Sequence, residues 1–83
     1  DPVNVVALEA LARHLYAQGE YFEARAFSQR RLDAARATPA ALLLASQIEE
    51  KLGDKAAAAR YVQRMRTEFP QTQAVLPGDS SSR

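Results

Sequence analysis

The chain has 83 residues, no cysteine and a formal net charge of +1, from eleven Lys and Arg against ten Asp and Glu. This length allows one small domain with a marginal core, and the lack of cysteine excludes disulfide and thiol chemistry. The near-neutral charge gives no overall field that would draw the chain to nucleic acid or to an acidic membrane.

The first predicted helix covers residues 5–18. Its apolar positions follow the i, i+3, i+4, i+7 spacing of one packing stripe. These positions are Leu8, Leu11, Ala12 and Leu15. Asn4 is the expected N-cap, and Gly19 is expected to end the helix in the left-handed conformation.

The second predicted helix begins near Glu20 or Tyr21 and runs to about Ala37. Its packing face should contain Ala24, Phe27 and Ser28. Three arginines lie in its later turns, where positive charge opposes the helix dipole favourably. They are Arg30, Arg31 and Arg36. Because no glycine or aromatic cradle accompanies them, we interpret them as a solvated face and not as a phosphate-binding patch.

The third predicted helix starts at Thr38-Pro39, an N-cap followed by a proline in the first helical position, and runs to about Leu52. Its buried stripe should consist of Ala41, Leu44, Ala45, Ile48 and Leu52. Gly53 ends this helix, and Asp54 caps the next one. A tight turn therefore joins the third helix to the fourth.

The fourth predicted helix directs one apolar face inward and one polar face outward. The inward residues are Ala58, Tyr61, Val62, Met65 and Phe69, and the outward ones are Arg60, Gln63, Arg64 and Thr67. Phe69-Pro70 stops the helix, because the residue before a proline avoids the helical region. The polar composition of residues 71–83 predicts a flexible C-terminal tail.

One unit is written twice in this sequence. The offset that takes Gly19 to Gly53 also takes Ala24 to Ala58 and Gln29 to Gln63. A period of about 34 residues, made of a helix, a Gly-acidic turn and a second helix, is typical of the tetratricopeptide (TPR) repeat. We therefore predict an all-α fold of tandem antiparallel helix pairs, an α-solenoid segment, with repeats at about 5–38 and 39–70.

The residues that could carry chemistry do not converge. His14 is the single histidine and has no acidic neighbour at ligand spacing, so we interpret it as a partly exposed structural residue. Glu49 and Glu50 point about 100° apart on a helix and cannot share a proton; they should be solvated or paired with arginines of a neighbouring helix. We expect no enzyme activity, no cofactor and no metal site.

The chain resembles the TPR family at its signature positions. Those positions are Leu8, Ala12, Gly19, Tyr21, Ala24, Leu42, Gly53, Ala58 and Pro70. It departs from the family at four others, where Ser28 replaces a large residue, Arg31 and Glu49 occupy usually apolar sites, and Arg36 replaces a proline. The departures suggest a longer or differently packed second helix and an ion pair between Arg31 and Glu49.

A narrower resemblance is to the C-terminal repeats of the type IV pilus biogenesis pilotin lipoproteins, the PilF/PilW group. It is carried by Ala7-Leu8-Glu9, Leu15-Tyr16, Tyr21 with Ala24-Arg25, Leu42-Leu43-Leu44, Ala57-Ala58 with Tyr61, and Arg64 with Phe69-Pro70. The resemblance implies a periplasmic protein anchored to the outer membrane through an N-terminal lipid-bearing region upstream of Asp1. Such a protein helps a secretin subunit reach the outer membrane and multimerise.

In the TPR family the first helix of each repeat lines a concave groove. Carried over to this chain, the groove residues are Val6, Glu9, Arg13, Tyr16, Leu43, Gln47 and Glu50. The expected partner is a protein, a secretin subunit or another pilus-assembly protein, with no nucleic acid and no membrane contact by this segment. The alternative is a TPR docking or regulatory segment of a larger cytoplasmic enzyme or assembly, and the sequence upstream of Asp1 would distinguish the two.

Overall fold

The computed structural model describes residues 2–71, and in this part of the chain all regular structure is helical. The four α-helices are α1 (Pro2–Ala17), α2 (Tyr21–Ala34), α3 (Pro39–Leu52) and α4 (Lys55–Glu68). No strand occurs within residues 2–71, so the predicted all-α class is confirmed. The tail predicted for residues 71–83 lies, apart from Gln71, outside the described residues.

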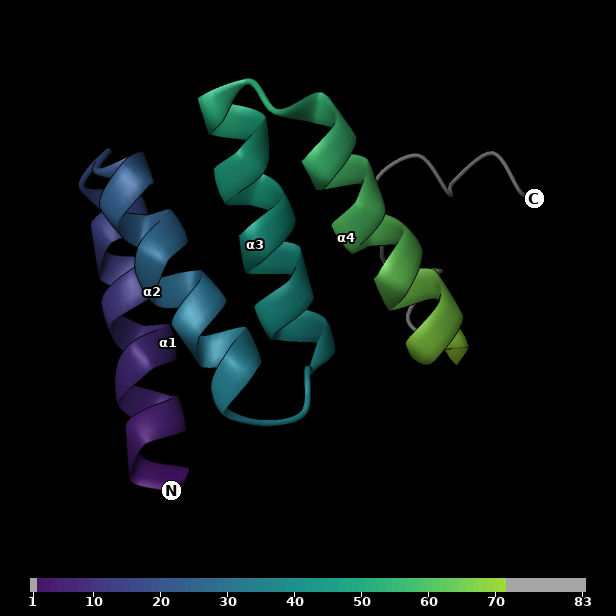
Figure 1. Ribbon diagram of the computed structural model, residues 1–83, viewed down its shortest axis with the longest axis horizontal. Helices are drawn as coiled ribbons and strands as arrows, with labels where there is room; N and C mark the ends of the chain where they lie inside the picture. The colour runs from purple at the N-terminus through teal and green to yellow at the C-terminus, as the bar shows by residue number, and fades with distance from the viewer. Residues whose placement is uncertain (1, 72–83) are drawn as a thin grey trace.

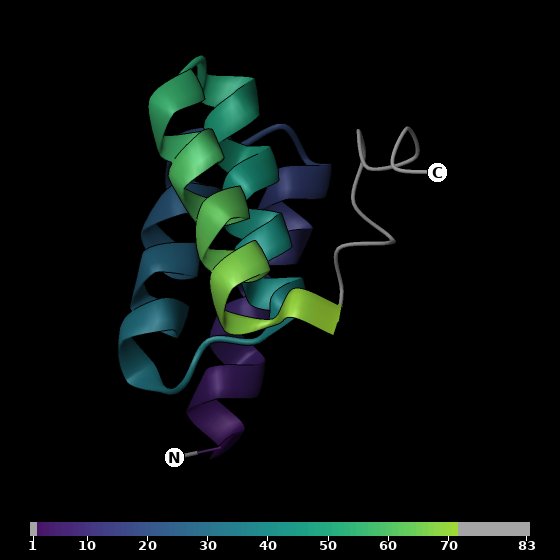
Figure 2. The same cartoon turned by 90° about the vertical axis from the view of Figure 1, so that its right-hand side faces the viewer.

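The helices pack in the order of the chain (Figure 1). The two closest pairs are α1 with α2 and α3 with α4, and α2 packs on α3 to join them. α1 and α3 touch over a smaller area. In Figure 2, α2 and α4 lie on one side of the molecule and α1 and α3 on the other. Within residues 2–71, α1 and α4 are therefore the two end helices, each with a face that no other described helix covers.

Several predicted helix ends are confirmed. The Thr38 hydroxyl accepts a hydrogen bond from the Ala41 N–H (3.1 Å), and the Asp54 carboxylate accepts one from the Ala57 N–H (3.0 Å). Each of these caps satisfies a backbone donor that the first turn of a helix leaves unpaired. Gly53 ends α3 with a φ of 84°, a left-handed conformation that glycine adopts without a steric cost.

α1 and α2 each differ from the prediction at one end, although Gly19 follows α1 in the predicted left-handed conformation (φ 80°). α1 begins at Pro2, so Asn4 lies inside the helix and its assignment as the N-cap was wrong. α2 ends at Ala34, before the predicted end at Ala37. The chain becomes extended at Ala35, and the Arg31 guanidinium donates a hydrogen bond to the backbone carbonyl of Arg36 (3.2 Å) in this connection. Thr38 is extended, as an N-cap requires.

The core consists of two clusters. The first joins α1, α2 and α3 through Ala12, Ala24, Leu44 and Ile48, with Leu15, Tyr16, Phe27 and Leu52 packed around them. The second joins α2, α3 and α4 through Leu42 and Met65, with Leu32, Ala37, Leu43, Tyr61, Val62 and Phe69 around them. The predicted stripes of α3 and α4 are confirmed. Leu11 is an exception, because it is 40% exposed.

Ala58 offers a test of the close approach between α4 and α3. Because Ala58 is only 2% exposed, Ala58→Leu would overpack this contact and should lower the free energy of unfolding by about 1–3 kcal/mol. Gln63 is exposed on the same helix, and Gln63→Leu should change stability by less than about 0.5 kcal/mol. Urea unfolding of both variants measures the difference, and equal midpoints would contradict the orientation of α4.

Candidate functional site

A buried ion pair connects α2 to α3. Arg25 donates two hydrogen bonds to the Glu49 carboxylate, from Nε to Oε2 (3.0 Å) and from Nη2 to Oε1 (2.7 Å). The Glu49 side chain is 4% exposed and that of Arg25 is 31% exposed. These hydrogen bonds raise the pKa of Arg25 above its usual value. The pair confirms that Glu49 binds an arginine of a neighbouring helix, whereas Glu50 pairs with Lys55 (2.8 Å).

A second ion pair connects α2 to α1. Arg31 Nε donates a hydrogen bond to Glu9 Oε1 (2.9 Å), and the same carboxylate accepts one from Arg13 Nη2 (2.8 Å). The predicted pairing of Arg31 with Glu49 was therefore wrong. Both residues are buried, but Arg31 faces α1 while Glu49 faces α2, so each finds a partner on a different helix.

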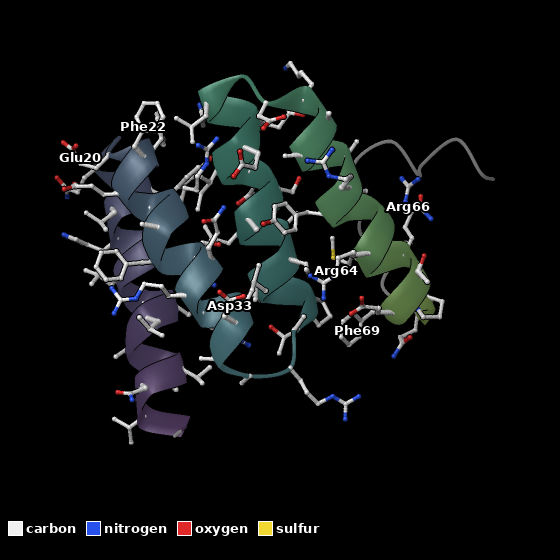
Figure 3. The ribbon with its side chains drawn as sticks, viewed as in Figure 1. Glu20, Phe22, Asp33, Arg64, Arg66 and Phe69 are labelled. Carbon is white, nitrogen blue, oxygen red and sulfur yellow. The ribbon has the colours of Figure 1, made fainter. Side chains whose placement is uncertain are left out.

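A groove of about 700 Å³ lies between α2 and α4. Its lining consists of Arg25, Gln29, Glu49, Asp54, Ala57, Arg60, Tyr61, Gln63, Arg64, Thr67 and Glu68. α3 contributes only Glu49 to this lining, in its ion pair with Arg25. Figure 3 shows Arg64 extending from α4 toward α3, whereas Arg66 points to the outer side of α4. We call this hollow the α2–α4 groove.

Some polar side chains of the α2–α4 groove already bind another residue of the chain, and others do not. Arg64 pairs with Glu68 on the same helix (3.0 Å), and Gln63 donates a hydrogen bond to Thr67 (3.3 Å). Arg60 is exposed and makes no ion pair within residues 2–71. Burial, with a smaller contribution from the Glu49 carboxylate, raises the pKa of Tyr61, so its hydroxyl stays a hydrogen-bond donor at neutral pH.

Three of the seven residues predicted to form a binding face lie together. Val6, Glu9 and Arg13 line an open hollow of about 540 Å³ beside the connection from α2 to α3. Val6 is 69% exposed, and Arg13 is also exposed. Glu9 is held by its two arginine partners. This part of the predicted face is accessible and carries one apolar and one positively charged group.

The other four predicted residues do not share that hollow. Tyr16 is half-buried, with its ring centroid 5.5 Å from that of Tyr21. Leu43 is half-buried against the second core cluster. Gln47 is exposed, and Glu50 is exposed and bound to Lys55. Two of the seven residues therefore take part in packing, and their proposed role in binding stays a prediction.

Sequence reasoning missed the α2–α4 groove. Arg60, Gln63, Arg64 and Thr67 were predicted to face away from the core, and all four are exposed as expected. The same residues nevertheless line the groove. A signal was present in the repeat, since Gln29 and Arg30 of α2 recur one period later as Gln63 and Arg64 of α4. Polar residues that recur on equivalent helices can mark a shared surface.

The residues considered for catalysis or metal binding remain apart. His14 is exposed on α1. Within residues 2–71 no three His, Asp or Glu side chains gather closely enough to hold a metal ion. The same residues include no helix that is long and apolar enough to cross a membrane.

Comparison with known proteins found no matching family model, no similar curated protein and no similar solved structure.

The Arg25–Glu49 pair should contribute measurably to stability. Arg25→Met leaves the Glu49 carboxylate nearly buried without its partner, and we expect a loss of about 2 kcal/mol, because Arg25 is partly exposed and water can replace some of its contact. Lys55→Met is the matched control, since the Lys55–Glu50 pair is exposed and should be worth less than about 0.5 kcal/mol. Equal urea midpoints for the two variants would show that the Arg25–Glu49 pair adds nothing beyond a surface pair.

Proposed function

We propose that this chain is a non-catalytic protein-binding scaffold, a TPR-type array of two helical pairs whose α2–α4 groove holds an extended segment of a partner protein. The observation that carries the proposal is the groove itself. In this groove the charges of Arg25 and Glu49 neutralise each other in an ion pair. Arg60 and the Tyr61 hydroxyl remain available as hydrogen-bond donors to a ligand. Such a surface can bind a peptide without first breaking its own core contacts.

The dimensions fit a short peptide. α4 has 14 residues and is therefore about 21 Å long. At about 3.3 Å per residue, an extended segment of about six residues would lie along it. The Tyr61 hydroxyl and the amides of Gln29 and Gln63 can bond the backbone of the peptide, which gives affinity without strict sequence selection. Arg60 adds a preference for an acidic or C-terminal carboxylate group.

The resemblance to the pilotin group supplies the biological setting of the proposal. In that setting the chain belongs to a periplasmic lipoprotein of type IV pilus biogenesis, and the bound segment belongs to a secretin subunit or another pilus-assembly protein. The scaffold would bring that subunit to the outer membrane and assist its multimerisation. The internal repeat and the packing of α2 on α3, which joins the two helical pairs, support the TPR part of this proposal.

Charge reversals at two exposed arginines test the groove. Arg60→Glu lies in the α2–α4 groove, and Arg13→Glu lies on the face of α1 predicted from sequence. Both side chains are exposed, so both variants should keep the fold, as checked by circular dichroism. In cells that make the natural protein, Arg60→Glu should reduce secretin multimers, and Arg13→Glu should not. Undiminished multimers with Arg60→Glu would overturn the proposed groove, and a loss with Arg13→Glu alone would favour the α1 face instead.

A further inference from the structure

α1 carries an exposed apolar stripe along its outer side. Its apolar members, Val3, Ala7 and Leu11, recur at helical spacing, and His14 continues the same line. Val3 is 72% exposed and Leu11 is 40% exposed. Charged side chains such as Glu or Lys would indicate a solvated surface. None of the stripe residues is a Glu, Asp, Lys or Arg. The composition is that of a packing surface.

The internal repeat shows what such a surface packs against. The residues one period after Ala7, Leu11 and His14 are Ala41, Ala45 and Ile48 on α3. These three are 2%, 3% and 0% exposed, respectively. α2 packs on α3, and Ile48 shares the first core cluster with Ala24 of α2. α1 and α3 therefore present equivalent faces; that of α3 packs on α2, whereas no helix within residues 2–71 packs on that of α1.

The helix equivalent to α2 is α4, at the opposite end of the molecule (Figure 1). The residues of α2 that face α3 include Arg25 and Leu32. Their counterparts one period later on α4 are Ala59 and Arg66, and Arg66 points to the outer side in Figure 3. By the repeat, the outer side of α4 is therefore equivalent to the side of α2 that packs on α3.

At one equivalent position the two helix pairs also match in chemistry. Within the chain, Arg25 of α2 meets Glu49 of α3 as an ion pair. Their counterparts are Ala59 of α4 and Leu15 of α1, so both partners change from charged to apolar together. A contact between these two helices would leave neither a charge nor a polar group unpaired at this position.

We propose that a second copy of this chain covers the stripe of α1 with its own α4. The contact repeats the packing of α2 on α3, with Val62 of α4 and Leu11 of α1 in the places of Ser28 and Ala45, which are both buried. The interface is heterologous, since each copy uses α1 toward one neighbour and α4 toward the other. Such an interface does not close on itself and adds copies in a row. This inference goes beyond the proposed function and does not depend on the α2–α4 groove.

The first test is a concentration series in sedimentation equilibrium. The wild-type chain should associate with rising concentration, and Leu11→Glu and Ala59→Glu should each weaken association by at least about tenfold, because each places a charge in the contact. Val6→Glu and Gln63→Glu are the matched controls on the same two helices but away from the contact, and all four side chains are exposed. A wild-type chain that stays monomeric at all concentrations would overturn the proposal.

Mixing the two disruptive variants tests whether α1 of one copy contacts α4 of the other. The Leu11→Glu variant keeps an intact α4, and the Ala59→Glu variant keeps an intact α1, so an equimolar mixture should form dimers and nothing larger. A contact of α1 with α1 would instead be abolished by Leu11→Glu alone and unaffected by Ala59→Glu. That result, or a mixture that stays monomeric while the wild type associates, would also overturn the proposal.

Discussion

Glu9→Leu should lower the free energy of unfolding by about 3–4 kcal/mol, the largest loss that we expect from a single charged residue. The Arg31 side chain is only 5% exposed and would remain buried without its carboxylate partner. Removing one member of a buried pair is costly because the charge that remains is neither solvated nor neutralised. The Nη1 atom of Arg31 is already buried without a hydrogen-bond partner among the described residues, so little compensation is available.

The second repeat suggests a second substitution that would restore the stability lost in Glu9→Leu. The residues one period after Glu9 and Arg31 are Leu43 and Met65, which pack in the second core cluster. Glu9→Leu combined with Arg31→Met would copy that apolar contact into the first repeat. Because a well-packed apolar pair often equals or exceeds a buried ion pair, the double variant should be as stable as the wild type or more stable.

Urea unfolding of the two single variants and the double variant measures the coupling between Glu9 and Arg31. The control is Glu50→Leu, which removes a carboxylate from an exposed pair with Lys55 and should change stability by less than about 0.5 kcal/mol. If Glu9→Leu and Glu50→Leu had equal effects, or if the double variant were no more stable than Glu9→Leu, the buried contact between α1 and α2 would be wrong.

Leu42→Ala should lower the free energy of unfolding by about 2–5 kcal/mol. Leu42 is fully buried in the second core cluster, where it packs with Met65 of α4 and Leu32 of α2. Its truncation removes apolar contacts to both neighbours and leaves a cavity where three helices meet. The effect should therefore be a global loss of stability and not a local loosening of α3.

Leu11→Ala is the matched control for Leu42→Ala, because it is the same substitution at a leucine that is 40% exposed on the outer side of α1. We expect a loss of less than about 1 kcal/mol for this variant, measured in dilute solution by urea unfolding. A loss as large as that of Leu42→Ala would mean that α1 buries Leu11 within the monomer. It would then contradict the bare stripe from which the association of two copies is inferred.

The helices and most of their ends could be predicted from sequence, because each rests on a local signal. Thr38-Pro39, Gly53 and Asp54 act within one turn, and the apolar spacing of α3 and α4 fixes their buried sides. The early end of α2 instead accompanies the hydrogen bond from Arg31 to the Arg36 carbonyl, and Arg31 is itself positioned by Glu9 of α1. No local pattern in residues 31–36 contains that information.

Local signals could predict neither the ion-pair partners of the buried charges nor the position of the α2–α4 groove. Arg31 and Glu49 both stand at usually apolar positions, which correctly suggests that they lie inside, but the choice of Glu9 and Arg25 as partners depends on which helices become neighbours. The α2–α4 groove likewise forms between helices that are not consecutive in the chain, since α3 separates them. Leu11 fits the apolar stripe of α1 but is exposed, since no helix of the described chain covers that side.

The most direct test of the scaffold proposal is site-specific photo-cross-linking in cells that make the natural protein. A photoreactive phenylalanine derivative at Gln63 probes the α2–α4 groove, and the same residue at Gln47 of α3 probes the face predicted from sequence; both positions are exposed. We expect a covalent adduct with a secretin subunit from position 63 and none from position 47. An adduct from position 47 alone, or none from either position, would contradict the α2–α4 groove as the binding site.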